Sequence, residues 1–265
     1  MKILIFWDIY WRVGRKAFAK NIGELKEKYS PDFVLVNVDN ATSWKWIIEK
    51  HAKYFENFWV DLMTSGDHIF DNFDKVKDYL FSTNSKIIIP ANFYDKELQK
   101  KWFKLLEKNW KKLLVIHIMD ETFMTHKVYN PFLRIEEILE KFNDEKLDWI
   151  VLDFHKEVSS SWYAVVHYFW DKISFIYGTH THIQTNDDYI FDSGIGILSD
   201  VWMTWPINSV IWADFKTVQN RFTTWINKWK IEQSLDKKYI LNAVCVEIDG
   251  WITKNIEKIK IIDKL

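Results

Sequence analysis

The sequence predicts an α/β fold in which strands buried on both faces alternate with amphipathic helices. Nearly continuous apolar runs at residues 1–7, 33–38 and 149–154 are typical of strands in a parallel sheet that is covered on both sides. The chain has 265 residues, of which 48% are hydrophobic and 28% charged, so it can bury a substantial core. Because no repeat, low-complexity tract or linker interrupts it, we expect one domain over residues 1–265.

Strands and helices alternate in the first half of the chain. Phe18, Ile22 and Leu25 recur at helical spacing and predict the first helix. Pro31 ends that helix, because the residue before a proline is disfavoured in the α conformation. The expected helices of this half are residues 15–29, 47–58 and 73–81. The expected strands are residues 1–7, 33–38, 62–64, 86–89 and 113–118, the last within a strand-rich segment at 98–119.

Two further helices precede a C-terminal third that consists mainly of strands. Ile135, Ile138 and Phe142 lie on one face of the first of these helices. The expected helices of this half are residues 131–142, 161–169 and 214–225. The expected strands are residues 149–154, 173–177, 195–198, 239–248 and 256–262.

Charge and cysteine usage favour a cytoplasmic protein. The net charge of −1 provides no general attraction to nucleic acid or to an anionic membrane. Cys245 is the one cysteine, so a disulfide within the chain is excluded and nothing indicates secretion. Residues 1–6 read as a short strand rather than a signal peptide, and no segment is long and apolar enough to span a bilayer.

Tryptophan and glycine occur in an abnormal ratio, with 16 Trp and 7 Gly. Glycine normally makes up about 7% of a protein, and tryptophan far less. Trp59 lies where a glycine would end a helix, and Trp110 follows Asn109 as the glycine of an Asn-Gly hairpin turn would. Further tryptophans at glycine-like positions are Trp7, Trp11, Trp44, Trp46, Trp202, Trp205 and Trp212. We hypothesise that many are UGA codons read as glycine by the host; the alternative is a genuinely aromatic-rich protein.

Polar side chains follow five of the expected strands at the point where each strand ends. In open α/β sheets, ligands bind outside the carboxyl ends of the strands, so these side chains would meet at one edge. His180 and His182 are the most suggestive pair, because imidazole is the commonest metal ligand and Gly178 permits a close backbone approach. Any one of these residues alone would more simply cap a strand or face solvent, but together they favour a metal site. The candidates are Asp8, Asp39, Asn40, Asp67, His68, His155, His180 and His182.

The ligand types indicate which ions and which reaction to expect. Oxygen ligands mixed with imidazole suit Mn, Fe or Zn better than Ca or Mg. The candidates outnumber what one tetrahedral ion needs, whereas two ions with a bridging carboxylate would use them all. Two ions about 3.5–4 Å apart can stabilise both the attacking and the leaving oxygen of a phosphoryl displacement.

Four other histidines lie outside this pattern. His117 is within an expected strand and is expected to be a satisfied core residue, and His126 is a loop residue that could line a substrate cleft. His51 and His167 show no relation to the strand ends.

The motifs resemble those of the calcineurin-like metallophosphoesterases and, more narrowly, of the YmdB-type subfamily. The likeness covers nearly the whole chain. The stretches that carry it are residues 2–9, 37–41, 66–68, 90–92, 151–155, 178–185 and 199–206. In most of them a glycine of the family falls on a tryptophan of this chain, which supports the recoding hypothesis.

This resemblance implies a four-layer α/β/β/α sandwich that hydrolyses phosphodiesters, including 2′,3′-cyclic nucleotides, with two iron or manganese ions, or zinc. It also implies a role for each residue: Asp8, Asn40 and His182 at one ion, Asp67, His155 and His180 at the other, Asp39 bridging, and His68 as general acid. The substrate would be a small phosphate ester or nucleotide, with RNA ends a further candidate, and the protein could form a homo-oligomer.

Two residues depart from the family, which has glutamate at position 39 and asparagine at position 67. The shorter Asp39 would bridge two ions less well, and the extra charge of Asp67 would weaken the Lewis acidity of its ion. Two alternatives therefore stay open: a phosphomonoesterase with the same ions, and a metal-binding regulatory protein with little turnover. Trp7 raises a separate question, because an indole next to Asp8 could crowd the site.

Overall fold

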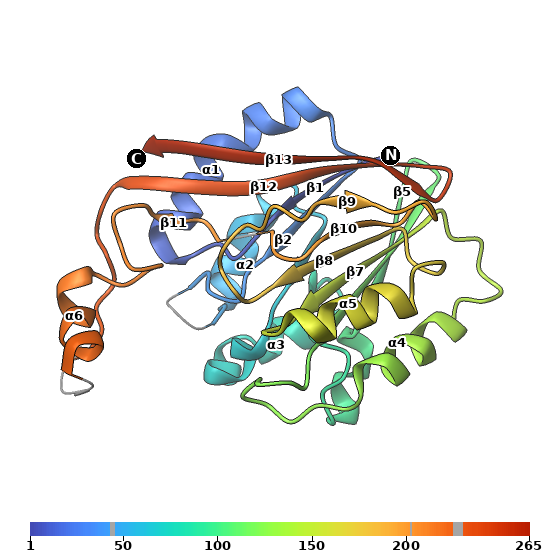
Figure 1. The fold of residues 1–265 in the computed structure, drawn as a ribbon, viewed down its shortest axis with the longest axis horizontal. Helices are drawn as coiled ribbons and strands as arrows, with labels where there is room; N and C mark the ends of the chain where they lie inside the picture. Colours follow the sequence, from blue (N-terminus) through green and yellow to red (C-terminus); the bar gives the residue numbers. More distant parts are fainter. Residues whose placement is uncertain (43–45, 202, 225–229) are drawn as a thin grey trace.

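The computed structural model consists of two β-sheets packed face to face, with helices on their outer faces (Figure 1), and it describes residues 1–42, 46–201, 203–224 and 230–265. The first sheet has seven strands in the order β11-β12-β1-β2-β3-β4, with β13 paired to β12. The second has six strands in the order β5-β6-β7-β8-β10-β9. The arrangement is the four-layer α/β/β/α sandwich expected from the sequence.

The first sheet combines a parallel half with a long antiparallel hairpin. β1 to β4 run parallel, while β12 lies antiparallel to both β1 and β13. Its strands are β1 (Lys2–Phe6), β2 (Phe33–Asn37), β3 (Leu62–Thr64), β4 (Ile87–Ile88), β11 (Trp205–Pro206), β12 (Lys238–Asp249) and β13 (Ile252–Lys264). The helices of this part are α1 (Trp11–Tyr29), α2 (Glu49–Glu56), the 3-10 helix η1 (Asp67–Lys75) and α3 (Lys77–Phe81).

The second sheet is parallel from β6 through β7 and β8 to β10, and β5 and β9 pair antiparallel at its edges. Its strands are β5 (Phe103–Lys108), β6 (Lys111–Met119), β7 (Trp149–His155), β8 (Phe175–Thr179), β9 (Tyr189–Ile190) and β10 (Gly196–Leu198). The associated helices are the 3-10 helix η2 (Lys96–Lys101), α4 (Pro131–Glu140) and α5 (Ser159–Tyr168). A sixth α-helix, α6 (Phe215–Thr224), projects from the body at the left of Figure 1.

Alternation of side chains along each strand divides the core into inner and outer layers. Ile3 and Ile5 of β1 pack between the sheets with Val115 and Val151, whereas Phe6 packs on the helical side. The layer between the sheets draws on strands from both ends of the chain, and we therefore propose that residues 1–265 form one domain.

Most expected elements are present, but some boundaries differ, one expected helix differs in its first part, and one expected strand-rich segment begins with a helix. The helix expected at 73–81 is wrong in its first part, because the chain turns at Gly66 and forms η1 at once, with non-helical backbone at Asn72 before α3. The start of the expected strand-rich segment at 98–119 is instead η2. The two-residue strands β9 and β11 were not predicted, because so short a run has no readable period. Trp44, Trp202 and Trp225 lie outside the described residues.

Among the helices that the structure describes, none combines the length and apolar character that crossing a membrane requires. The cytoplasmic location expected from the sequence stays a prediction.

Candidate metal centre

Both sheets contribute side chains to one site at the carboxyl ends of their strands. The first sheet supplies Asp8 after β1, Asp39 after β2 and Asp67 after β3. The second supplies His155 as the last residue of β7 and His180 directly after β8. Because parallel strands end at a common edge, residues far apart in sequence come together there.

One group of possible ligands consists of Asp67, His155 and His180. Each offers a ligand atom, and these atoms lie within 4.8 Å of one another. Nε2 of His155 is 3.3 Å from Oδ1 of Asp67, and the rings of His155 and His180 have centroids 4.8 Å apart. A second group within the same distance consists of Asp39, Asp67 and His68. Asp67 is therefore common to the two groups.

Asp8, Asn40 and His182 form the other side of the site. Nε2 of His182 lies 3.1 Å from Oδ2 of Asp8, and the Asn40 amide donates a hydrogen bond of 2.8 Å to Oδ1 of Asp8. The rings of His180 and His182 have centroids 6.3 Å apart, and each faces a different carboxylate group. The spacing of two residues thus directs one imidazole to each side of the site.

Three of these residues have left-handed backbone, with φ of 37° at Asp8, 91° at His180 and 62° at His182. Such conformations cost a non-glycine residue about 1–3 kcal/mol and concentrate at functional sites, where the surrounding structure enforces them. The strained turns aim side chains from the ends of β1 and β8 into the site rather than along the strand direction.

Gly66 leaves the space in which the ligands converge. A Cβ at this position would lie 2.6 Å from Nε2 of His155 and 2.9 Å from Oδ2 of Asp39, closer than real contacts allow. Any side chain at this position would therefore displace the imidazole or the carboxylate. A cradle that a methyl group would fill, surrounded by carboxylates and imidazoles, fits a transition-metal ion.

The charges of the site also favour a cation. Burial, together with the neighbouring carboxylates of Asp67 and Asp8, raises the pKa of Asp39 well above its ordinary value. Burial and the adjacent His155 lower the pKa of His180 to about 3, so this imidazole is neutral at pH 7 and its lone pair is free to coordinate. Burial opposes the charged form of His182, but the Asp8 carboxylate outweighs it and raises the pKa of His182.

His68 lies at the border of the site, with about a quarter of its side chain exposed. Its Nδ1 is 3.0 Å from Oδ2 of Asp71, and its Nε2 is 3.8 Å from Oδ1 of Asp67. His126, from the loop before α4, contacts the backbone carbonyl of Asp67 through Nε2 at 3.0 Å. Trp7 does not crowd the site, because its fully buried indole packs between the sheets against Tyr177.

Sequence reasoning missed several residues around these candidates. Oε2 of Glu157 lies 3.1 Å from Nε2 of His180, and only its position two residues after His155 hinted at such a contact. Thr179 and Asp153 hydrogen-bond behind His155. These hydrogen bonds depend on which residues of neighbouring strands lie opposite one another, and the sequence alone does not give this register.

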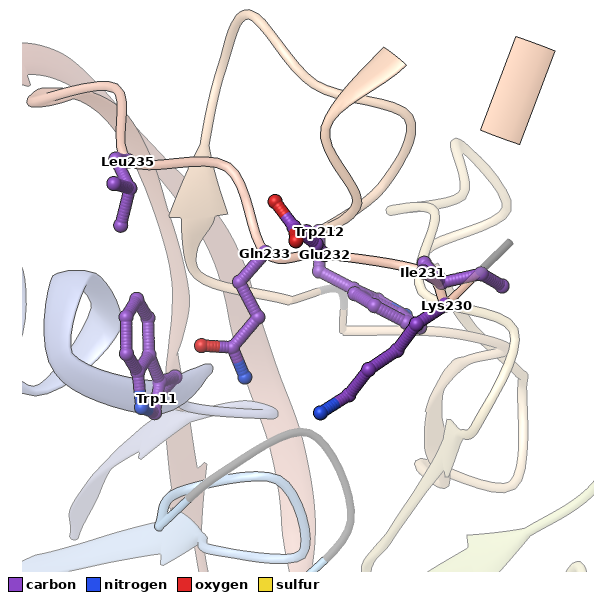
Figure 2. A pocket seen from close by; sticks show the side chains of 7 residues that line it. All are labelled: Trp11, Trp212, Lys230, Ile231, Glu232, Gln233 and Leu235. Atoms are coloured by element: carbon purple, nitrogen blue, oxygen red, sulfur yellow. The ribbon is translucent and has the colours of Figure 1, made fainter. Parts of the chain in front are cut away.

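A cavity of about 420 Å³ lies at the start of α1, and its lining residues are distinct from the candidate ligands. Trp11 lines it and donates its backbone N–H to the backbone carbonyl of Asn40 at 2.9 Å. The side chains of Lys230 and Gln233 point into the space between Trp11 and Trp212 (Figure 2).

The two facing sheets, with Asp and His side chains grouped at their strand ends, have the fold of the calcineurin-like phosphoesterases. The fold matches that of a calcineurin-like phosphoesterase from Bacillus subtilis with a TM-score of 0.59, at 13% identity, over 100% of this chain and 90% of that chain. More narrowly, the chain belongs to the YmdB-like protein family, whose profile matches residues 4–262.

Two relatives support this membership over nearly their full length. The chain is 30% identical to the 2′,3′-cyclic-nucleotide 2′-phosphodiesterase of Bacillus subtilis strain 168, over 99% of this chain and 98% of the relative. The crystal structure of a phosphatase from Mycoplasma pneumoniae matches with a TM-score of 0.88 at 27% identity, over 100% of this chain and 94% of that chain.

Proposed function

We propose that the protein hydrolyses phosphodiesters of the 2′,3′-cyclic nucleotide type with two metal ions, iron or manganese in preference to zinc. The observation that carries the proposal is the pair of overlapping Asp/His groups, built by strand ends of both sheets, with Asp8, Asn40 and His182 beside them. The name of the Bacillus relative supports the substrate class.

The residues divide into two ligand sets that share a carboxylate. Asp67, His155 and His180 would hold one ion, and Asp8, Asn40 and His182 the other. Asp39 would contact both. When bound, the ions supply Lewis-acid activation of water and neutralise charge on the phosphate.

His68 is suited to protonate the leaving ribose oxygen. Its ring is partly exposed at the border of the site, so a substrate can reach it. The contact of Nδ1 with Asp71 orients the ring and leaves Nε2 for proton transfer. A positioned general acid contributes about 10²- to 10⁴-fold to the rate of such a reaction.

The proposal predicts that His68→Ala lowers kcat for 2′,3′-cyclic AMP by about 10²- to 10⁴-fold while the metal content stays at two ions per chain. The measurement is hydrolysis of this substrate, of a generic diester and of a monoester by metal-loaded protein, with metal analysis of each variant. His167→Ala is the matched control, because His167 is an exposed histidine on α5. Bound metal without hydrolysis would favour a regulatory role, and faster cleavage of the monoester would favour a phosphomonoesterase.

A further inference from the structure

We propose that a buried support network behind the metal centre positions two of its candidate ligands, His155 and Asp39. The members of this network are Ser65, His117, Asp153 and Thr179, all of them fully buried. The inference rests on the metal-site proposal and assigns a role to residues that do not reach the ions.

The first half of the network holds the ring of His155. Nδ1 of His155 lies 2.9 Å from the hydroxyl of Thr179, and that hydroxyl donates to Oδ1 of Asp153 at 3.3 Å. Because the hydroxyl donates its proton to Asp153, its oxygen is left to accept from Nδ1–H of His155. Nε2 of His155, on the side of Asp67, then carries the lone pair that a metal ligand needs.

The second half connects this ring to the other sheet. Nδ1 of His117 forms a hydrogen bond of 3.3 Å with the backbone carbonyl of Asp153 and lies 2.9 Å from Oδ2 of the same residue, without a hydrogen bond to it. Its Nε2 lies 2.9 Å from the backbone carbonyl of Ser65. The Ser65 hydroxyl in turn donates to Oδ1 of Asp39 at 3.0 Å. The network therefore extends from β7 and β8 of the second sheet to the end of β3 in the first sheet. It connects His155 and Asp39, two candidate ligands that come from different sheets.

Strand register explains why these residues meet. In the second sheet His117 of β6 is the partner of Asp153 in β7, and His155 of β7 is the partner of Thr179 in β8. His117 is the satisfied core residue expected from the sequence, since it is fully buried and both of its nitrogens have oxygen partners. Those oxygens belong to Asp153 and Ser65, two other members of the support network.

The test compares Mn²⁺ binding by Thr179→Val, which removes the hydroxyl at nearly constant volume, with binding by Thr179→Ser, which keeps it. We expect Thr179→Val to bind Mn²⁺ about 10- to 100-fold more weakly than the natural protein, the usual effect of losing a partner of a metal ligand. Thr179→Ser should restore most of the affinity. Thr253→Val is the control, because the buried hydroxyl of Thr253 donates at 2.7 Å to the carbonyl of Ser174 and not to a ligand.

Each outcome decides the inference. Natural affinity in Thr179→Val overturns it, and so does an equal loss in Thr253→Val, which would indicate general destabilisation. A natural protein that binds no Mn²⁺ overturns the metal site itself and this inference with it. If Thr179→Val does not fold, ¹⁵N NMR of the natural Zn²⁺-loaded protein decides: we expect Nδ1 of His155 protonated, and protonated Nε2 overturns the inference.

A different observation supports a second proposal, on the identity of four tryptophans. Trp11, Trp59, Trp110 and Trp251 have left-handed backbone, with φ of 44°, 53°, 62° and 77°. Only glycine adopts this region without steric cost. We propose that these four codons are UGA and that the host reads them as glycine.

Two of these positions complete hairpin turns that normally contain glycine. Asn109 and Trp110 connect β5 to β6 with φ of 53° and 62°, and Gly250 and Trp251 connect β12 to β13 with φ of 50° and 77°. A two-residue loop with both φ values positive is a type I′ turn, in which Asn-Gly and Gly-Gly are strongly preferred. Trp59 occupies the glycine-favouring position shortly after the end of α2.

The gene sequence and the mass of the natural protein test this proposal. TGA codons at positions 11, 59, 110 and 251, with tryptic peptides from the host that have the mass of glycine at these positions, are the expected result. TGG codons would overturn it. TGA codons with peptides of tryptophan mass would overturn it as well, because the host would then read UGA as tryptophan.

Discussion

Removing the metal ions with a chelator is expected to abolish phosphodiester hydrolysis and to lower the unfolding temperature. The decrease in unfolding temperature should grow as the pH rises above 7. Ions present at 1,000 times their Kd stabilise a folded protein by about 4 kcal/mol relative to the metal-free form. Without them, Asp8, Asp39 and Asp67 are left buried side by side. Hydrogen bonds and histidines of the protein relieve part of the repulsion between these carboxylates. In the metal-free protein, the rest is relieved by protonation of the carboxylates or of the histidines beside them.

The direction of the pH dependence follows from the pKa shifts in the metal-free protein. The pKa values of His155 and His182 are raised above 6.5, so their protons stabilise the fold below that pH and this contribution is lost as the pH rises. The raised pKa of Asp39 also makes stability fall as the pH rises above 3.8, because the folded protein holds a proton that the unfolded chain has already released. The lowered pKa values of Asp8 and Asp67 matter only in acid, where stability falls as the pH drops through them. The pKa values of His180 and His51, lowered to about 3 and about 4, oppose the loss up to about pH 6.5, because there the unfolded chain binds protons that these rings do not bind in the fold.

Between pH 7 and pH 8.5 the metal-free protein should therefore lose stability, while the loaded protein should change less, because ions replace the protons. Calorimetry of both forms at pH 7 and pH 8.5 measures the gap between their unfolding temperatures. Asp39→Asn, which cannot ionise, should show a smaller pH dependence in the metal-free form. A gap of constant size over this range would contradict the proposed exchange of protons for ions.

The candidate ligands could be chosen from the sequence, whereas the residues that support them could not. Asp8, Asp39 and Asp67 could be selected because each follows an apolar run that reads as a buried strand, and strand ends meet by the geometry of the sheet. The support network could not be selected, because its contacts depend on which residue of β6 lies opposite which residue of β7. The sequence pattern places a side chain on a strand but does not give its partner in the neighbouring strand.

The same distinction applies to the fold. The strands of the inner layers were predicted because burial on both faces leaves continuous apolar runs, as in β1 and β7. The 3-10 helix η1 was not, because its start is decided by the turn at Gly66 that opens the metal centre. The local pattern alone favoured a later α-helix at that point.

Replacing Trp59 and Trp110 together by glycine is expected to raise the free energy of unfolding by about 2 kcal/mol. Left-handed backbone costs an ordinary L-residue about 1–2 kcal/mol, and part of the gain from glycine, about 0.4–1 kcal/mol, is lost to the greater freedom of the unfolded chain. Both indoles are largely exposed, at 77% for Trp59 and 102% for Trp110, so their removal forfeits little buried area. The Trp59 ring also has Nζ of Lys26 at 5.6 Å, and the loss of this cation–π contact offsets part of the gain at position 59.

Denaturant unfolding of the double variant measures this gain against two controls. Trp170→Gly removes an indole that is 51% exposed and not among the left-handed residues, so it should be neutral or slightly destabilising. Trp162→Gly should cost about 3–5 kcal/mol, because Trp162 is fully buried and stacks with Phe154. If the double variant is instead destabilised like Trp170→Gly or more, tryptophan suits these turns and the steric argument for glycine at positions 59 and 110 fails. A gain confined to the left-handed positions would show that the backbone of this fold is built for glycine there.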